Sequence, residues 1–112
     1  MTDETTETPV LDLLAKMTSD SIEASNLDAE TLALVRLAAL IAVDAPPASY
    51  LLNLGAAGEA GVEAQQIQDV LVTVAPIVGT ARVASATGKM ARAFGLALDL
   101  AAYEDAEDEV SS

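Results

Sequence analysis

The polar residues best placed for chemistry lie in one stretch, DAPPASYLLNLGAAGEAG, which spans residues 44–61. Ser49 and Asn53 are four positions apart and share one face of a predicted helix, while Tyr50 is turned away by about 100°. Together with Arg36, these residues could line a pocket for a small anionic ligand. A structural role is the preferred interpretation: Ser49 caps or bonds to its own helix, Tyr50 packs at an interface, and Asn53 satisfies a backbone group.

Cysteine and histidine are absent from the sequence. Their absence excludes thiolate nucleophiles, disulfides, thiolate metal sites and imidazole bases, so we predict no cofactor and no metal. Acid–base chemistry near pH 7 would then need a carboxylate whose pKa is raised or a lysine whose pKa is lowered. The carboxylates that such an enzyme would use are Glu59, Glu63 and Asp69, within or just after the polar stretch.

The chain is strongly acidic, with a formal net charge of −13 over 112 residues. Binding to nucleic acid requires clustered cations, so we predict no nucleic-acid partner. Eight of the 18 acidic residues lie near the two ends. We therefore expect residues 1–8 and 103–112 to be acidic, disordered tails, and residues 9–102 to form one domain.

No segment has the pattern of a signal peptide or a membrane span. The apolar run from Leu32 to Val43 has 12 residues and contains Arg36, whereas a spanning helix needs about 20 apolar residues. We expect a soluble, cytoplasmic protein with no membrane partner.

The periodicity of the apolar residues predicts an all-α fold of five or six helices. Thr8 is placed to cap a first helix that has Pro9 at its first position, and Asp28 is placed to cap a second, central helix. A third helix should run from about Pro47 to Ala60. Gly55 and Gly58 inside it are best explained by close helix packing.

The remaining pattern predicts two further helices. One covers VEAQQIQDVLVTVA and is kinked or ended by Pro76, and a long final helix begins after Gly79. Arg82, Lys89 and Arg92 fall within one arc of that last helix. We interpret them as a solvated face that neutralises acids of the tails or of a neighbouring subunit, in preference to an anion site.

The order of these features resembles the carboxymuconolactone decarboxylase family, which includes the AhpD-like alkylhydroperoxidases. The resemblance covers roughly residues 27–90. It is carried by LDAETLALVRLAAL, EAGVEAQQIQDVL and APIVGTARVASATGKM. The matching positions are Gly61, Ile67, Asp69, Val70, Leu71 and Gly79.

The resemblance also implies where the reactive residues of the family would stand. The histidine falls on Asn53, the CxxC pair on Pro46 and Ser49, and the acidic proton relay near Ala33 or Leu34. Proline, serine and asparagine cannot replace a redox thiolate or a proton shuttle. Peroxidase or disulfide-reductase chemistry of the family type is therefore excluded for this chain acting alone.

Two hypotheses of different kinds follow. The first is a non-catalytic, self-associating module. Apolar residues make up 52% of the chain but aromatic residues only 3%, so we expect a thin core. Part of the apolar surface would then be buried between subunits. The resemblance implies a trimer or a hexamer. The second is an enzyme of altered, carboxylate-based chemistry, resembling a decarboxylase or isomerase. A buried acid in a closed cavity near Asn53 would favour the enzyme, and a filled pocket with exposed carboxylates would favour the module.

Overall fold

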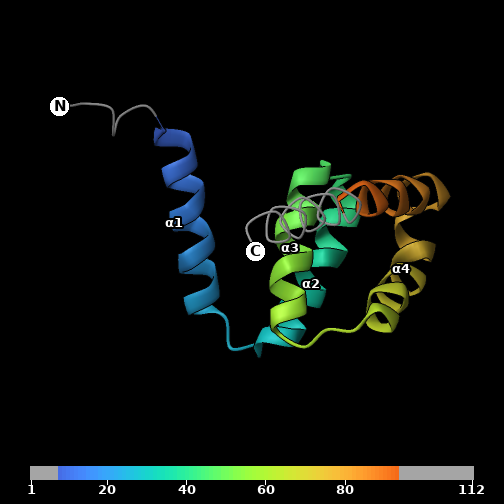
Figure 1. Ribbon diagram of the computed structural model, residues 1–112, viewed down its shortest axis with the longest axis horizontal. Helices are drawn as coiled ribbons and strands as arrows, with labels where there is room; N and C mark the ends of the chain where they lie inside the picture. Colours follow the sequence, from blue (N-terminus) through green and yellow to red (C-terminus); the bar gives the residue numbers. More distant parts are fainter. Residues whose placement is uncertain (1–7, 94–112) are drawn as a thin grey trace, which may run out of the picture.

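The computed structural model describes residues 8–93, and the secondary structure over this span is entirely α-helical (Figure 1). Four helices are α1 (Pro9–Ala24), α2 (Ala29–Val43), α3 (Pro47–Glu59) and α4 (Ala64–Val78). Residues 80–93 form a fifth. The predicted all-α fold is confirmed. The tails predicted at 1–8 and 103–112, Thr8 excepted, lie outside the described residues, as does the predicted continuation of the last helix.

The helix starts follow local signals, with one exception. Asp28 caps α2 as predicted, because its Oδ1 accepts a hydrogen bond of 2.8 Å from the backbone N–H of Thr31. Pro9 occupies the first position of α1. The prediction that the side chain of Thr8 caps this helix is wrong: it accepts no hydrogen bond from the first turn, because the Thr8 backbone, with φ of −130° and ψ of 47°, lies outside the extended region usual for capping residues. Its hydroxyl donates to Asp12 Oδ1 at 3.3 Å.

The helix ends also follow the sequence. Asp44 closes α2 in the left-handed region with φ of 57°, and Gly61 follows α3 with φ of 92°, which glycine adopts without steric cost. Pro76 does not end its helix, since α4 continues through it to Val78. Gly79, with φ of 90°, then separates α4 from residues 80–93.

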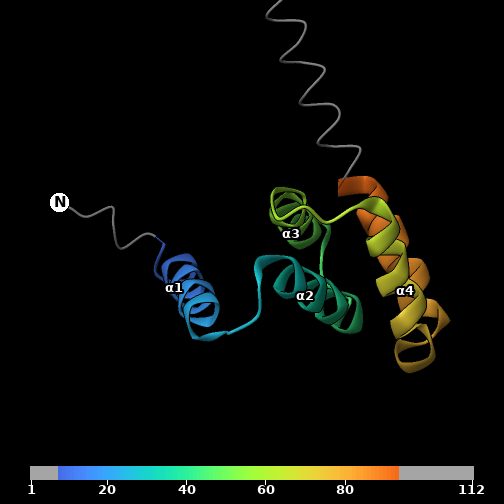
Figure 2. The same cartoon turned by 90° about the horizontal axis from the view of Figure 1, so that it is seen from below.

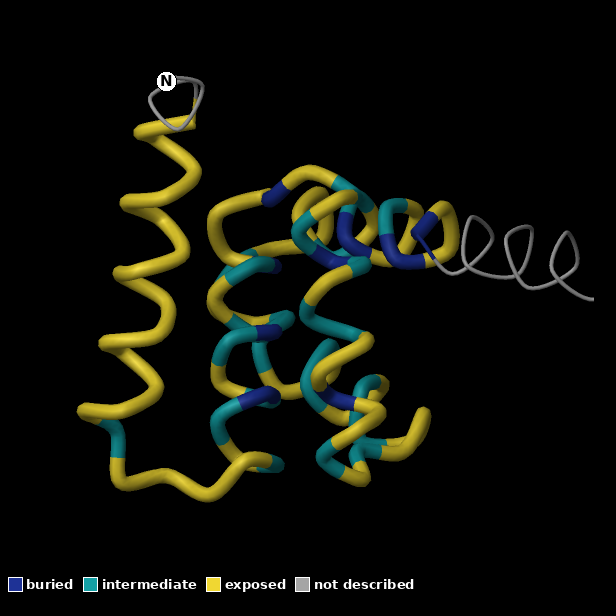
Figure 3. The backbone as a smooth tube through the Cα atoms, turned by 60° about the vertical axis from the view of Figure 1, so that its left-hand side comes forward, coloured by how far each residue is buried: buried dark blue, intermediate teal, exposed yellow. Residues whose placement is uncertain are grey.

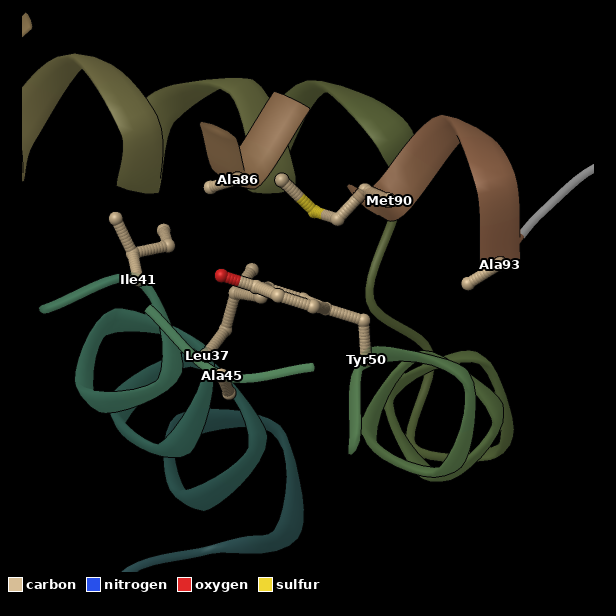
Figure 4. Packing of buried hydrophobic residues seen from close by; sticks show 7 residues of the cluster. All are labelled: Leu37, Ile41, Ala45, Tyr50, Ala86, Met90 and Ala93. Carbon is tan, nitrogen blue, oxygen red and sulfur yellow. The ribbon is translucent and has the colours of Figure 1, made fainter. Parts of the chain in front are cut away.

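The core forms where the end of α2, the start of α3 and residues 80–93 meet (Figure 4). Helix α2 packs against both α3 and α4, so the prediction of a central helix is confirmed. The buried cluster consists of Leu37, Ile41, Ala45, Tyr50, Ala86, Met90 and Ala93. Most of these side chains are small or aliphatic, as the composition indicated.

The two glycines inside α3 do not pack against another helix. A Cβ built on Gly55 or on Gly58 would meet no atom within 4 Å, and both residues are exposed. The prediction of close packing at these positions is wrong for the described part of the chain, because the face of α3 that carries them is open.

Helix α1 stands apart from the other helices. It lies to one side of the α2–α3 pair in two perpendicular views (Figures 1 and 2), and its whole length is exposed (Figure 3). A hydrogen bond of 3.2 Å from Arg36 Nη2 to Ser21 Oγ links it to α2. Of the helices within residues 8–93, none combines the length and the apolar character that crossing a membrane requires.

Candidate functional site

A groove of about 730 Å³ runs between α1 and the α2–α3 pair. Its walls are mainly apolar, and most of its lining comes from α2 and α3. Only the last turns of α1 reach it, through Thr18 and Ile22. The other lining residues are Leu27, Ala29, Leu32, Ala33, Arg36, Ala39, Leu40, Ser49, Leu52, Asn53, Ala56 and Ala60. The volume falls within the usual range for small-ligand sites.

Three of the four residues predicted to form a ligand pocket line this groove: Arg36, Ser49 and Asn53. Each is half-buried. The amide of Asn53 donates from Nδ2 to the backbone carbonyl of Ala33 at 3.3 Å, which is the structural role that the sequence favoured for it. Ser49 donates its backbone N–H to Pro46 O at 3.0 Å within the first turn of α3.

Tyr50, the fourth of these residues, lies elsewhere. It is fully buried in the core, on the side of α3 that faces residues 80–93, and its ring lies between Leu37 and Met90 (Figure 4). Its hydroxyl has no hydrogen-bond partner among residues 8–93. Burial raises the pKa of the Tyr50 phenol, and the negative charge of Asp44 raises it further. One step along a helix turns the side chain by about 100°, which separates Tyr50 from Ser49.

The positions at which the family's reactive residues would stand are close together in space. Pro46 and Ser49 occupy the N-terminus of α3, and Asn53 follows one turn later. Ala33, one of the two positions matched to the acidic relay, lies across from Asn53 on α2, where its carbonyl accepts the Asn53 hydrogen bond. The two helices therefore meet at these positions, but no titratable side chain stands at any of them.

Carboxylates are absent from the residues that line the groove. Glu59 and Glu63 are exposed at the end of α3 and just before α4. Asp69 is also exposed; it accepts a hydrogen bond of 3.1 Å from Gln65 Nε2 and lines a separate hollow of about 360 Å³ between α2 and α4. Over residues 8–93 no three acidic side chains gather in a way that could hold a metal ion.

A polar cluster that sequence reasoning missed joins the end of α2 to residues 80–93. Asp44 Oδ1 accepts hydrogen bonds from Ser85 Oγ at 2.7 Å and from Lys89 Nζ at 2.9 Å. Lys89 Nζ also donates to the Asp44 carbonyl at 3.2 Å. The hydrogen bond from Ser85, followed by that from Lys89, lowers the pKa of Asp44.

This cluster changes the interpretation of the cationic arc. Lys89 forms an ion pair with Asp44, an acid within the described part of its own chain that the sequence pattern did not predict as its partner. Arg82 and Arg92 remain exposed. The ammonium group lies beside the C-terminus of α2, where the helix dipole favours a cation, so the cluster holds residues 80–93 in place. The partners are 45 positions apart in sequence, and no local pattern pairs them.

Comparison with known proteins agrees with this geometry. A model of the carboxymuconolactone decarboxylase family matches residues 8–92, which is most of the chain. Searches of curated proteins and of solved structures find no match. The matched region contains all four labelled helices, the groove and the family-site positions. The chain belongs to the carboxymuconolactone decarboxylase family.

Proposed function

We propose that this protein is a non-catalytic, self-associating module that keeps the family fold for binding or assembly. The observation that carries the proposal is the hydrogen bond from Asn53 Nδ2 to the Ala33 carbonyl. Through this bond the side chain of Asn53, at the position matched to the family's histidine, makes a structural contact with α2, the helix that carries the position matched to the acidic relay.

The chemistry available at these positions supports the same conclusion. Pro46 has no nucleophilic atom, and a serine hydroxyl such as that of Ser49 ionises far above neutral pH and does not exchange with disulfides. Asn53 can donate and accept hydrogen bonds but cannot take up a proton at pH 7. A peroxide or a lactone in the groove would therefore meet no general base and no redox centre.

The alternative, an enzyme that uses a carboxylate as base, has less support. The groove is hollow, which such an enzyme needs, but the three candidate carboxylates Glu59, Glu63 and Asp69 are exposed and lie outside its lining. Arg36 lines the groove and could receive a small anion. The walls around it are mainly apolar, so we do not favour as the occupant a small anionic metabolite, which has little apolar surface to bury there.

The catalytic half of the proposal is tested by assay. Purified protein should consume hydroperoxide in the presence of dithiol, and decarboxylate carboxymuconolactone, no faster than buffer alone. An active enzyme of the family, measured at the same concentration, shows that the assay can detect turnover. Turnover by this chain that disappears in the Asn53→Ala variant would overturn the proposal.

The assembly half is tested by sedimentation. Twelve large apolar side chains in the described region are exposed, and six of them lie together on the single helix α1. We expect sedimentation equilibrium at micromolar concentration to give a mass that is a multiple of 11.4 kDa, and a trimer or hexamer would match the family resemblance. A single species of monomer mass would contradict this half.

A further inference from the structure

Helix α1 leaves its apolar side chains in water. Six large apolar residues on its 16-residue length are between 50% and 68% exposed. They are Val10, Leu11, Leu13, Leu14, Met17 and Ile22. A helix of this length is only marginally stable in water unless it packs against something. Within residues 8–93, α1 buries none of its residues, so no packing partner for it lies in the described part of the chain.

The groove on the α2–α3 flank has the complementary surface. Its floor and far wall are formed by aliphatic side chains of the two helices, and Leu52 within it is 77% exposed. The two helices that form its walls, α2 with 15 residues and α3 with 13, are similar in length to α1, which has 16. A helix laid along them would bury apolar side chains on both sides at once.

The chain's own α1 does not occupy this groove. The connection from Ser25 to Asp28 leaves α1 alongside the α2–α3 pair, and only Thr18 and Ile22 border the open space (Figures 1 and 2). The groove is therefore bordered by α1, α2 and α3 and leaves room for one more helix.

We infer that the α1 helix of a second copy fills this groove, so that two chains exchange α1 helices around a two-fold axis and close each other's groove. Of the two assemblies named above, a hexamer built of three such pairs contains this axis, whereas a trimer does not. The inference rests on the self-association proposed above and names the surfaces that produce it. In a two-fold arrangement the same pair of surfaces is used twice, and both exposed faces are buried in one step. The family-site positions Ser49 and Asn53 would then lie beneath the partner's helix.

Charge favours the same occupant. Among the described residues that line the groove, Arg36 is the charged one. Helix α1 carries three acidic residues and one lysine, a net charge of −2, and that lysine, Lys16, is already paired with Asp20 at 2.7 Å. A partner's α1 would therefore bring the carboxylates of Asp12 and Glu23 toward the guanidinium of Arg36.

Because the sequence contains no cysteine, any disulfide in a cross-linking experiment must form between thiols introduced by substitution. Leu14→Cys chains and Met17→Cys chains are each mixed with Leu52→Cys chains and oxidised mildly. We expect disulfide-linked heterodimers from at least one of these mixtures. The matched control replaces the groove cysteine with Val72→Cys on α4, a site that is 71% exposed but away from the groove, and should give no more than the background of random collisions.

A second measurement tests the same contact without a thiol. Leu14→Asp and Leu52→Asp should each lower the association constant at least tenfold in sedimentation equilibrium. Ile77→Asp introduces the same charge at a site that is 85% exposed on α4 and should leave association unchanged. Circular dichroism of each variant confirms that the remaining helices are folded.

The outcomes separate this inference from the proposed function. If the wild-type chain is monomeric, self-association and helix exchange both fail. If it associates, but Leu14→Asp and Leu52→Asp still associate and the cysteine mixtures do not cross-link, the assembly proposal survives and the exchange is wrong. A disulfide formed within a single chain of the Leu14→Cys/Leu52→Cys double variant, at monomer mass, would show that α1 folds onto its own groove and would also overturn the inference.

Discussion

Asn53 Nδ2 lies 3.3 Å from the backbone oxygen of Ala33 and donates a hydrogen bond to it. The two residues are 20 positions apart and belong to neighbouring helices, α3 and α2. The contact links the position matched to the family's histidine with a position matched to its acidic relay. The two helices meet at these positions, although neither residue can transfer a proton.

Changing the donor tests this contact. Asn53→Ala should lower the free energy of unfolding by about 1 kcal/mol, the usual net value of one hydrogen bond. Asn53→Asp should cost more at pH 7, because it places a carboxylate against a carbonyl oxygen, and the difference between the two variants should shrink at pH 4, where that carboxylate takes up a proton. Urea denaturation at both pH values measures this, and equal stability of the two variants at pH 7 would contradict it.

Asp44 should make stability depend on pH. Its pKa is lowered from 3.8 in the folded chain by the hydrogen bonds from Ser85 and Lys89, so its contribution is present above that value and is lost as the pH falls through the lowered folded pKa. Asp44→Asn should therefore reduce stability at pH 7, and the difference from the wild-type chain should shrink as the pH falls below 3.8. Denaturation of both proteins across this range measures the effect. Asparagine also tolerates the left-handed backbone at this position, where φ is 57°.

Asp44→Ala serves as the matched comparison, because alanine removes the carboxylate and is also disfavoured in the left-handed region. It should be less stable than Asp44→Asn at every pH. Asp28, whose pKa is also lowered, chiefly by a hydrogen bond from the Thr31 backbone, keeps a remaining pH dependence in both variants.

Substitutions at Tyr50 distinguish the contribution of its ring to folding stability from the contribution of its hydroxyl. The ring is fully buried and its hydroxyl has no partner, so Tyr50→Phe should leave stability unchanged or raise it by about 1 kcal/mol. Tyr50→Ala removes the largest core side chain and should cost about 3–5 kcal/mol. A loss with Tyr50→Phe similar to that with Tyr50→Ala would show that the hydroxyl is needed.

The phenol of Tyr50 should also ionise at a higher pH than an exposed tyrosine. Its pKa is raised above 10.0 by burial and by Asp44, so stability should fall as the pH rises beyond 10.0, because the unfolded chain ionises first. Ultraviolet absorbance of the phenolate in a Tyr103→Phe background follows Tyr50 alone. A normal titration curve under folding conditions would contradict the burial of this side chain.

Glycine substitutions distinguish a backbone requirement from a helix interior. Gly61 has φ of 92°, so Gly61→Ala should lower stability by about 1 kcal/mol. Gly55 lies within α3 with nothing within 4 Å of an added Cβ, so Gly55→Ala should raise stability by up to about 1 kcal/mol. Thermal unfolding of both variants measures the two changes in stability, which should have opposite signs. Destabilisation by Gly55→Ala would indicate that another helix packs closely against Gly55 and would contradict the open surface seen there.

A cysteine pair placed at the family positions tests whether the scaffold still has the redox geometry. Pro46 and Ser49 are one turn apart, with the Ser49 N–H donating to the Pro46 carbonyl at 3.0 Å. The variant Pro46→Cys/Ser49→Cys should form a reversible intrachain disulfide, because a helix N-terminus stabilises the attacking thiolate. Thiol titration before and after reduction measures it, and the Pro46→Cys single variant should keep one free thiol.

Local signals in the sequence predicted most of the helices correctly. Apolar periodicity identified five helical segments, and Asp28, Pro9, Gly61 and Gly79 marked helix boundaries that the structure confirms. These signals act within one or two turns, and the physics that sets them is contained in the neighbouring residues. The predicted Thr8 cap was wrong because the backbone of Thr8 is not in the extended conformation that a capping residue usually adopts.

The sequence by itself determined which chemistry is absent, because a chain without cysteine and histidine has neither thiol nor imidazole however it folds. Only the tertiary structure decided which polar residues share a site. It placed Asn53 in the groove and Tyr50 in the core, although they are three positions apart, and it joined Asp44 to Lys89 across 45 positions. The reason is physical: residue types are fixed before folding, whereas the side that a residue faces depends on which helices pack against its own.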